Sequence, residues 1–257
     1  MPRRILRLAL PVGFSILTWQ ISALLMGPRL LPGPLAVALD FFSCLGDRAF
    51  LRDFSASALR AGAGIALALA IPFPLGLAMG ASRRLDALLS PIVFLTYPIP
   101  KVLLLPILLV LLGMGEAPKI LLVAVTVGYQ VLVVTRDSVL SLDPRFLDSF
   151  QSLWPRGREA HSKSFRRLML VWHVLGPAAL PSAATSVRLA SGTAVAVLFM
   201  AESFATQRGL GYVIIDAWGL MDLPRMFSGI LAMGLLGAFF YSLANLAERR
   251  LVPSGNA

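Results

Sequence analysis

The chain has 257 residues, 57% of them hydrophobic and 14% charged, with a mean hydropathy of +0.79. These values exclude an ordinary water-soluble domain and indicate that a lipid bilayer is the solvent. The net charge of +10 would suit nucleic acid, but the basic residues form short clusters between apolar runs, as in the cytoplasmic loops of membrane proteins. We therefore expect the bilayer as a partner and no nucleic acid.

Apolar runs of about 20 residues, the length of a membrane-crossing helix, recur along the chain. They predict an all-α integral membrane protein with about six transmembrane helices. The expected spans cover residues 8–26, 57–79, 92–112, 120–134, 174–200 and 227–246.

The N-terminal region, residues 1–30, has three arginines ahead of its apolar run, as a signal peptide does. The run is too long for a signal peptide and lacks a small-residue cleavage site, so we interpret it as a retained transmembrane helix. Residues 31–56 form the next segment, in which apolar residues alternate with charged ones. This pattern predicts an extracytoplasmic amphipathic helix at the membrane surface.

The core transmembrane domain is expected over residues 57–251. Its first span carries Gly62, Gly64, Gly76 and Gly80, small residues that let a neighbouring helix approach closely. Residues 136–173 contain the one long polar segment, which is rich in Arg and Lys. Loops assigned to the inside hold about twice as many basic residues as those outside, which places both termini in the cytoplasm.

Several short motifs, taken together, resemble the permease subunits of binding-protein-dependent ABC importers, and most closely the nitrate, sulfonate, taurine and bicarbonate type. The similarity covers roughly residues 31–251, and its motifs are Leu31-Pro32-Gly33-Pro34, Tyr97-Pro98-Ile99-Pro100, Gly113-Met114-Gly115-Glu116-Ala117-Pro118-Lys119, Ala201-Glu202-Ser203 and Gly209-Leu210-Gly211-Tyr212. The resemblance implies a type I permease bundle in the bacterial cytoplasmic (inner) membrane. It also implies a second permease copy as a homodimer, ATP-hydrolysing subunits and an extracytoplasmic solute-binding protein.

The resemblance further implies that a short helix in the 136–173 loop couples the permease to its ATP-hydrolysing subunit. The family signature, Glu-Ala-Ala followed by Gly, is matched imperfectly, either by residues 148–154 or from Glu159 onward. We prefer the second alignment, because its distance to Pro177 fits the family better. The expected coupling residues are Glu159, Ala160, His161, Ser164, Phe165, Arg166 and Arg167.

Charged residues inside spans are functional candidates because burying a charge in lipid is costly. The translocation-path candidates are Pro98, Pro100, Lys101, Arg188 and Glu202. The alternatives are that Lys101 extends to the interface and that Arg188 forms a structural ion pair. With the family, these cations favour a small oxyanion such as a sulfonate, taurine or nitrate as solute, although similar permeases carry pyrimidines and other organic solutes.

The sequence contains no recognisable catalytic or metal-ligand motif, and we expect no enzyme activity, metal or cofactor. Residues 157–164 are close to a phosphate-binding loop, but Ser162 replaces its second glycine. Cys44 is the single cysteine and suits a buried structural thiol. Two other functions stay open. One is a membrane scaffold or assembly protein without coupled transport, and the other is an ATP-independent secondary transporter, which the absence of an internal repeat disfavours.

Overall fold

A computed structural model of the protein describes residues 2–143, 169–204 and 206–251, with side chains from residue 10 onward. In these ranges every regular element is helical. The chain divides into two compact units, Met1–Ala58 with Glu202–Leu235 and Leu59–Ala201 with Leu236–Ala257. We describe each unit separately.

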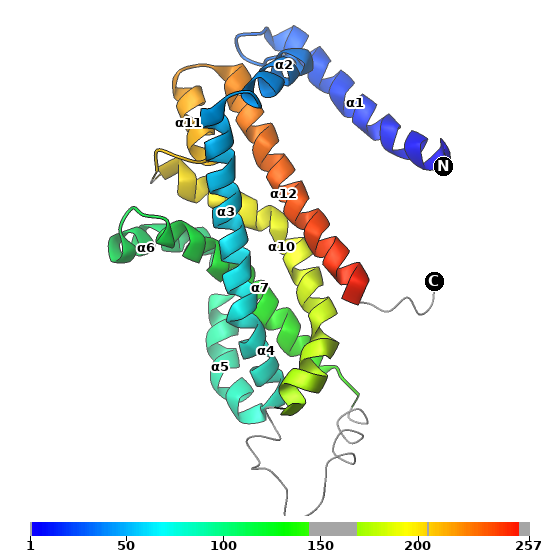
Figure 1. The fold of residues 1–257 in the computed structure, drawn as a ribbon, viewed down its shortest axis with the longest axis vertical. Helices are drawn as coiled ribbons and strands as arrows, with labels where there is room; N and C mark the ends of the chain where they lie inside the picture. The colour runs from blue at the N-terminus through cyan, green and yellow to red at the C-terminus, as the bar shows by residue number, and fades with distance from the viewer. Residues whose placement is uncertain (1, 144–168, 205, 252–257) are drawn as a thin grey trace, which may run out of the picture. The chain divides into compact units, whose positions relative to one another are not determined.

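The α-helices of both units are labelled in Figure 1. In chain order the helical elements are α1 (Pro2–Met26), α2 (Pro34–Cys44), α3 (Arg48–Ala70), α4 (Pro72–Ala81), α5 (Arg83–Thr96), the 3-10 turn η1 (Lys101–Leu104), α6 (Leu105–Leu112), α7 (Ala117–Leu140), the π-helical turn η2 (Val171–Leu175), α10 (Gly176–Phe204), α11 (Leu210–Gly219) and α12 (Leu223–Leu251).

Four helical segments in the described part of the chain are long and apolar enough to cross a membrane: Arg48–Ala81, Ala117–Leu140, Val171–Phe204 and Leu223–Leu251. The bent pair Arg83–Thr96 and Lys101–Leu112 would make a fifth span. Leu10–Met26, Pro34–Cys44 and Leu210–Gly219 are shorter apolar helices, so the expected count of about six spans stays a prediction. The all-helical membrane fold expected from the sequence is therefore confirmed, whereas the sidedness of the termini stays a prediction.

In the first unit, α2 and α3 are separate helices where the sequence suggested one amphipathic segment. The chain turns at Gly46 and Asp47, and an Asp47 carboxylate oxygen accepts a hydrogen bond from the backbone N–H of Ala49 at 2.8 Å. A carboxylate in this position supports a helix start, so α3 begins at Arg48, well before the expected residue 57. The sequence pattern missed this start because the first turns of α3 are charged.

Arg225 at the start of α12 connects three parts of the first unit. Its guanidinium donates to the Asp47 carboxylate and to the Cys44 sulfur, both at 2.7 Å, and lies over the Phe50 ring. Burial, reinforced by the neighbouring Asp40, raises the pKa of Cys44 to about 11, so the thiol stays protonated at neutral pH. This environment agrees with the structural role expected for the cysteine.

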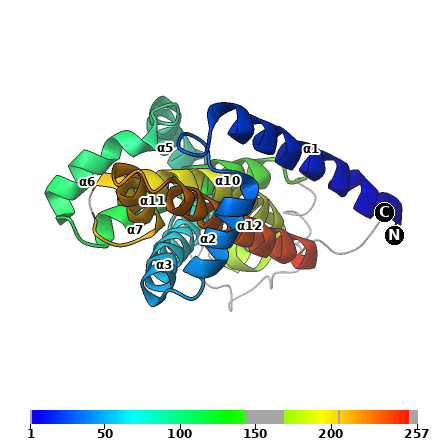
Figure 2. The ribbon, with the colours of Figure 1, turned by 90° about the horizontal axis from the view of Figure 1, so that it is seen from above.

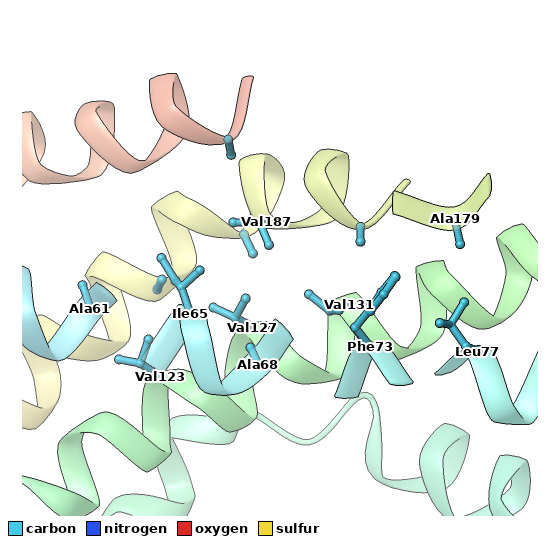
Figure 3. Close-up of a cluster of buried hydrophobic side chains, with 14 of the residues drawn as sticks. Ala61, Ile65, Ala68, Phe73, Leu77, Val123, Val127, Val131, Ala179 and Val187 are labelled. Atoms are coloured by element: carbon cyan, nitrogen blue, oxygen red, sulfur yellow. The ribbon is translucent and has the colours of Figure 1, made fainter. Parts of the chain in front are cut away.

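The second unit has an apolar core, shown in Figure 3, to which helices α3, α4, α7, α10 and α12 contribute mostly small and β-branched side chains. Ile65 and Ala68 of α3 lie against Val123 and Val127 of α7, and Val187 of α10 packs on the same cluster. These side chains are buried within the protein, so this face of each helix is shielded from lipid. In a bilayer such contacts depend on close packing, because lipid is as apolar as the side chains.

Glycines create the contact of α3 and α4 with α7. A Cβ atom added at Gly64 would lie 2.6 Å from Val123 Cγ1, and one added at Gly80 would lie 2.5 Å from Val139 Cβ. Gly76 faces the backbone oxygen of Leu132 in the same way, at 2.7 Å. These distances are too short for any side chain, so the predicted role of the small residues is confirmed at these three positions. Gly62 differs, with only the Phe240 ring nearby.

Prolines interrupt the helix in two of the expected spans, and the second of these is sharply bent. Pro72 and Pro74 follow the end of α3 at Ala70, because proline cannot continue the hydrogen-bond ladder of a helix. The expected span 92–112 is bent by 94° between α5 and α6, at residues 97–100. Figure 2 shows α6 turning away from α5. Pro98 and Pro100 therefore stand in the middle of this segment, whereas the sequence placed them near its start.

Candidate functional site

The predicted coupling residues cannot be located, because Glu159, Ala160, His161, Ser164, Phe165, Arg166 and Arg167 lie outside the described residues, as does the alternative match at residues 148–154. Their role stays a prediction. The path candidates Pro98, Pro100, Lys101, Arg188 and Glu202 are all described.

Lys101 stabilises the break between α5 and α6. Its ammonium group donates to the backbone oxygens of Thr96, Tyr97 and Ile99 at 2.6, 3.1 and 2.9 Å. It also lies 4.1 Å from the centre of the Tyr129 ring. Helix α5 ends at a turn that contains Pro98 and Pro100, and Lys101 donates to carbonyl groups at the helix end and in this turn. All three donor positions of the ammonium are used.

Arg188 of α10 forms an ion pair with Glu248 of α12, with 2.9 Å between Nε and Oε2. The Thr185 hydroxyl donates to the same carboxylate at 2.8 Å, and the Arg188 guanidinium lies over the Tyr241 ring. Arg188 thus has the partners of the structural ion pair weighed in the sequence analysis. Within the described residues, no hydrogen bond or ion pair joins it to Lys101, so these two candidates do not form one cluster.

Glu202 forms the centre of what we call the Glu202 site, which also contains Asp53, Ser57 and the first backbone N–H groups of α11. Its side chain is 0% exposed and accepts from the Ser57 hydroxyl at 2.8 Å and from the N–H of Gly211 at 2.9 Å. The Ser57 oxygen accepts from the N–H of Leu210, and Asp53 accepts from that of Gly209. Three successive N–H groups at the start of α11 are therefore satisfied by side chains.

The Glu202 site explains why a glycine precedes α11. Gly209 has a φ of +116°, a backbone conformation that side chains with a Cβ disfavour. With this turn the chain presents its next N–H groups to Ser57 and Glu202, and the positive end of the helix dipole favours a carboxylate there. Glu202 therefore has a clear role in fixing α11.

A second carboxylate forms what we call the Glu116 site, composed of Arg60, Glu116 and Lys119. The Arg60 guanidinium donates through Nε and Nη2 to the two oxygens of Glu116, the latter at 2.7 Å. Lys119 Nζ lies 3.8 Å from the same carboxylate. The two cations are 3% and 1% exposed, whereas the Glu116 side chain is 60% exposed. Hydrogen bonds from Arg60 lower the pKa of Glu116, so its carboxylate is ionised at neutral pH.

A third charged contact joins α5 to α7. Arg136 donates to both oxygens of Asp86, with 2.8 Å for Nη2, and to Asp137 at 2.6 Å. The Ser90 hydroxyl donates to Asp86 as well, and Arg136 lies over the Phe94 ring. Bidentate arginine–carboxylate contacts have a defined geometry and hold helices in register.

Sequence reasoning missed the Glu116 site, although both of its parts were visible. The motif Gly113–Lys119 was noted only for its resemblance, and Arg60 was not singled out. An arginine inside an expected apolar span, together with an acidic residue next to another span, was the signal that could have suggested the pair.

The fold and these sites define a class: a multi-pass helical membrane protein whose intramembrane charges are paired across helices. Comparison with known proteins identifies the family. Residues 70–253 match the binding-protein-dependent transport system inner membrane components. The chain belongs to this family and is a permease subunit of the inner membrane.

Relatives cover nearly all of the chain. The taurine transport system permease protein of Escherichia coli K12 is 29% identical over 91% of this chain and 84% of its own length. A putative aliphatic sulfonates transport permease protein of Bacillus subtilis is 26% identical over 94% and 85%. The riboflavin transport system permease protein of Chloroflexus aurantiacus is 30% identical over 95% and 89%.

Proposed function

We propose that this permease is the membrane-spanning subunit of an ATP-driven importer that moves a small oxyanion delivered by a solute-binding protein. The observation that supports the proposal most strongly is the family match over residues 70–253, with relatives named for taurine and aliphatic sulfonates. ATP hydrolysis is assigned to separate subunits. A second copy of the chain is proposed as the partner permease, because one bundle of this size supplies only half of a two-sided gate.

The proposed contact with the ATP-hydrolysing subunit is formed by residues 159–167, centred on Glu159. A short helix between two spans can transmit movement from a soluble motor if the contact has two discrete arrangements. Closure of the motors would then switch the solute's access from outside to inside.

Sulfonates and related oxyanions are the proposed solute class. The relatives named for sulfonates support it, and the buried cations of the Glu116 site supply groups that attract an anion. The riboflavin relative shows that similar permeases also serve another solute class. The oxyanion proposal therefore needs a test with both kinds of solute.

The test measures ATP hydrolysis by the complex of this permease with its cognate ATP-hydrolysing subunits, reconstituted in lipid. Binding protein is added empty, loaded with taurine or an alkanesulfonate, or loaded with riboflavin. Stimulation by the sulfonate-loaded protein alone is the expected result. Stimulation only by the riboflavin-loaded binding protein would overturn the proposed oxyanion class of solute. Solute uptake without ATP would favour a secondary transporter.

A pair of matched variants tests where coupling occurs. Glu159→Arg and Asp148→Arg reverse one charge at each of the two possible signature positions. We expect Glu159→Arg to abolish the stimulation and Asp148→Arg to preserve it. The reverse pattern would move the coupling helix to residues 148–154. If wild type binds the motors but no loaded binding protein stimulates hydrolysis, the scaffold function is favoured instead.

A further inference from the structure

Two buried cations of the second unit converge on a carboxylate that is itself accessible. Arg60 presents a bidentate fork and Lys119 an ammonium group to Glu116, which is 60% exposed. Glu116 also precedes the first turn of α7, where the positive end of the helix dipole adds to the attraction for an anion. The three contributions all favour negative charge at the position of the Glu116 carboxylate.

This set of donors suits a small oxyanion as well as it suits a glutamate. A guanidinium binds two oxygens of a carboxylate, sulfonate or nitrate in the same planar arrangement. An ammonium group adds a point charge without demanding a particular geometry. Glu116 therefore fills a place that a sulfonate group of similar size can also fill.

The chain around Glu116 leaves room for the glutamate to move. Gly113 has a φ of +74°, and neither it nor Gly115 has a heavy atom within 4 Å of an added Cβ. Met114 between them is 78% exposed. Residues 113–115 of the turn from α6 to α7 are therefore exposed, whereas Arg60 and Lys119 are buried within their helices.

We propose that Arg60 and Lys119 form an anion-binding site in which Glu116 is an internal substitute for the transported oxyanion, displaced when the solute enters. This inference rests on the proposed function, because it assigns the place where the solute's anionic group binds during transport. When no solute is bound, the glutamate holds a negative charge beside the two cations. It also lowers the apparent affinity for the solute, since the solute has to compete with a tethered carboxylate.

The test is a binding measurement on the assembled complex in lipid nanodiscs, without nucleotide or binding protein. Ethanesulfonate is titrated at constant ionic strength and its affinity is determined by calorimetry, with the neutral dimethyl sulfone as a control. We expect Glu116→Gln to bind ethanesulfonate about tenfold more tightly than wild type, as follows if Glu116 occupies the site about nine-tenths of the time. Dimethyl sulfone should bind neither protein.

Two further variants separate the site from general charge effects. Lys119→Gln, combined with Glu116→Gln, should lose the gain in affinity, because one of the two cations is missing. Asp222→Asn removes an equal negative charge from an exposed helix start and should leave the affinity of wild type unchanged. An unchanged affinity in Glu116→Gln, or an equal gain in Asp222→Asn, would overturn the proposal.

The same experiment separates this inference from the proposed function. The anion titration requires no coupling, so a tenfold gain in Glu116→Gln would stand even if loaded binding protein failed to stimulate ATP hydrolysis. That result would overturn the proposed importer function but would still support the anion-binding site. Stimulated hydrolysis by sulfonate-loaded protein without any gain in Glu116→Gln would support the importer and reject the site.

Discussion

The Glu202 and Glu116 sites both contain a carboxylate near the start of a helix, yet they distribute burial in opposite ways. At the Glu202 site the carboxylate is 0% exposed, and its partners include a hydroxyl and a backbone N–H. At the Glu116 site the cations are buried and the carboxylate is 60% exposed. A buried carboxylate with fixed donors serves structure, whereas an exposed one over buried cations can exchange with a solute.

The comparison also shows why burial of a charge is a poor guide to function when taken alone. Glu202, Arg60 and Lys119 are all almost fully buried. What distinguishes the two sites is whether the carboxylate and its hydrogen-bond donors can separate. The Gly211 N–H belongs to a helix and cannot leave Glu202, but the Glu116 side chain stands on an exposed turn.

The largest effect that we predict is a loss of stability at the Glu202 site. Glu202→Ala removes the acceptor of the Ser57 hydroxyl and of the Gly211 N–H in a buried place. Leaving such groups without a partner costs about 1–3 kcal/mol each, so we expect a loss of about 3 kcal/mol in the free energy of unfolding. The change is measured by heating the purified permease in detergent and recording the temperature at which its monodisperse fraction is lost.

Glu202→Gln is the matched variant, since it retains the size and one oxygen acceptor of the side chain. We expect it to lose about 1 kcal/mol, because an amide accepts more weakly than a carboxylate. If Glu202→Ala unfolds like wild type, the Glu202 site is not structural, and its contrast with the Glu116 site disappears.

A smaller loss of stability is predicted at the uncharged contact of α4 with α7. Gly80→Ala would place a Cβ 2.5 Å from Val139 Cβ on the neighbouring helix. Overpacking of this kind costs about 1–3 kcal/mol, which the better helix propensity of alanine offsets only in part. The matched control is Gly192→Ala in α10, where nothing lies within 4 Å of the added Cβ, and where the alanine should not destabilise. Equal thermal stability of both variants would contradict the close contact of α4 with α7.

Much of this architecture could be predicted from local sequence patterns. Apolar length identified the spanning helices, and the glycines at 64, 76 and 80 identified a helix contact, because both features are visible within a short stretch of chain. The start of α3 at Arg48 and the helix α11 were not predicted. In these places charged or short segments do not show the length and periodicity that signal a span.

The sites were harder to predict than the helices, because their partners are distant in sequence. Ser57 and Glu202 are 145 residues apart, and Arg60 and Glu116 are 56 apart. Local periodicity contains no information about such pairs, although the cost of a buried charge shows that a partner must exist. Lys101 illustrates the limit: its position was predicted to matter, but the carbonyls that it binds follow only from the break after α5.

A smaller loss is predicted for Glu116→Ala, about 1 kcal/mol. An ion pair with one exposed partner contributes less than a fully buried pair, whose disruption costs about 3–5 kcal/mol. Ethanesulfonate in the buffer should restore most of the loss, because it takes the place of the carboxylate beside Arg60. A loss that is large and insensitive to added anion would assign the Glu116 site to structure, as at Glu202.

The smallest predicted effect is a pH dependence of stability at the Glu116 site. The pKa of Glu116 is lowered below 4.5 by the hydrogen bonds from Arg60, so the folded state holds the carboxylate ionised more strongly than the unfolded chain does. Its contribution to stability is therefore fully present above the ordinary glutamate pKa and is lost as the pH falls through the lowered value.

Thermal unfolding of wild type and Glu116→Gln at pH 7, 4.5 and 3.5 measures this effect. The stability difference between the two proteins should be largest at pH 7 and should shrink as the pH falls through the lowered pKa of Glu116, because the protonated side chain resembles the glutamine. Ethanesulfonate keeps its charge over this range, so its binding to wild type should tighten as the pH falls. A carboxylate with a purely structural role does not exchange with an anion in solution. A stability difference between the two proteins that stays constant with pH would therefore contradict the exchange proposed for Glu116.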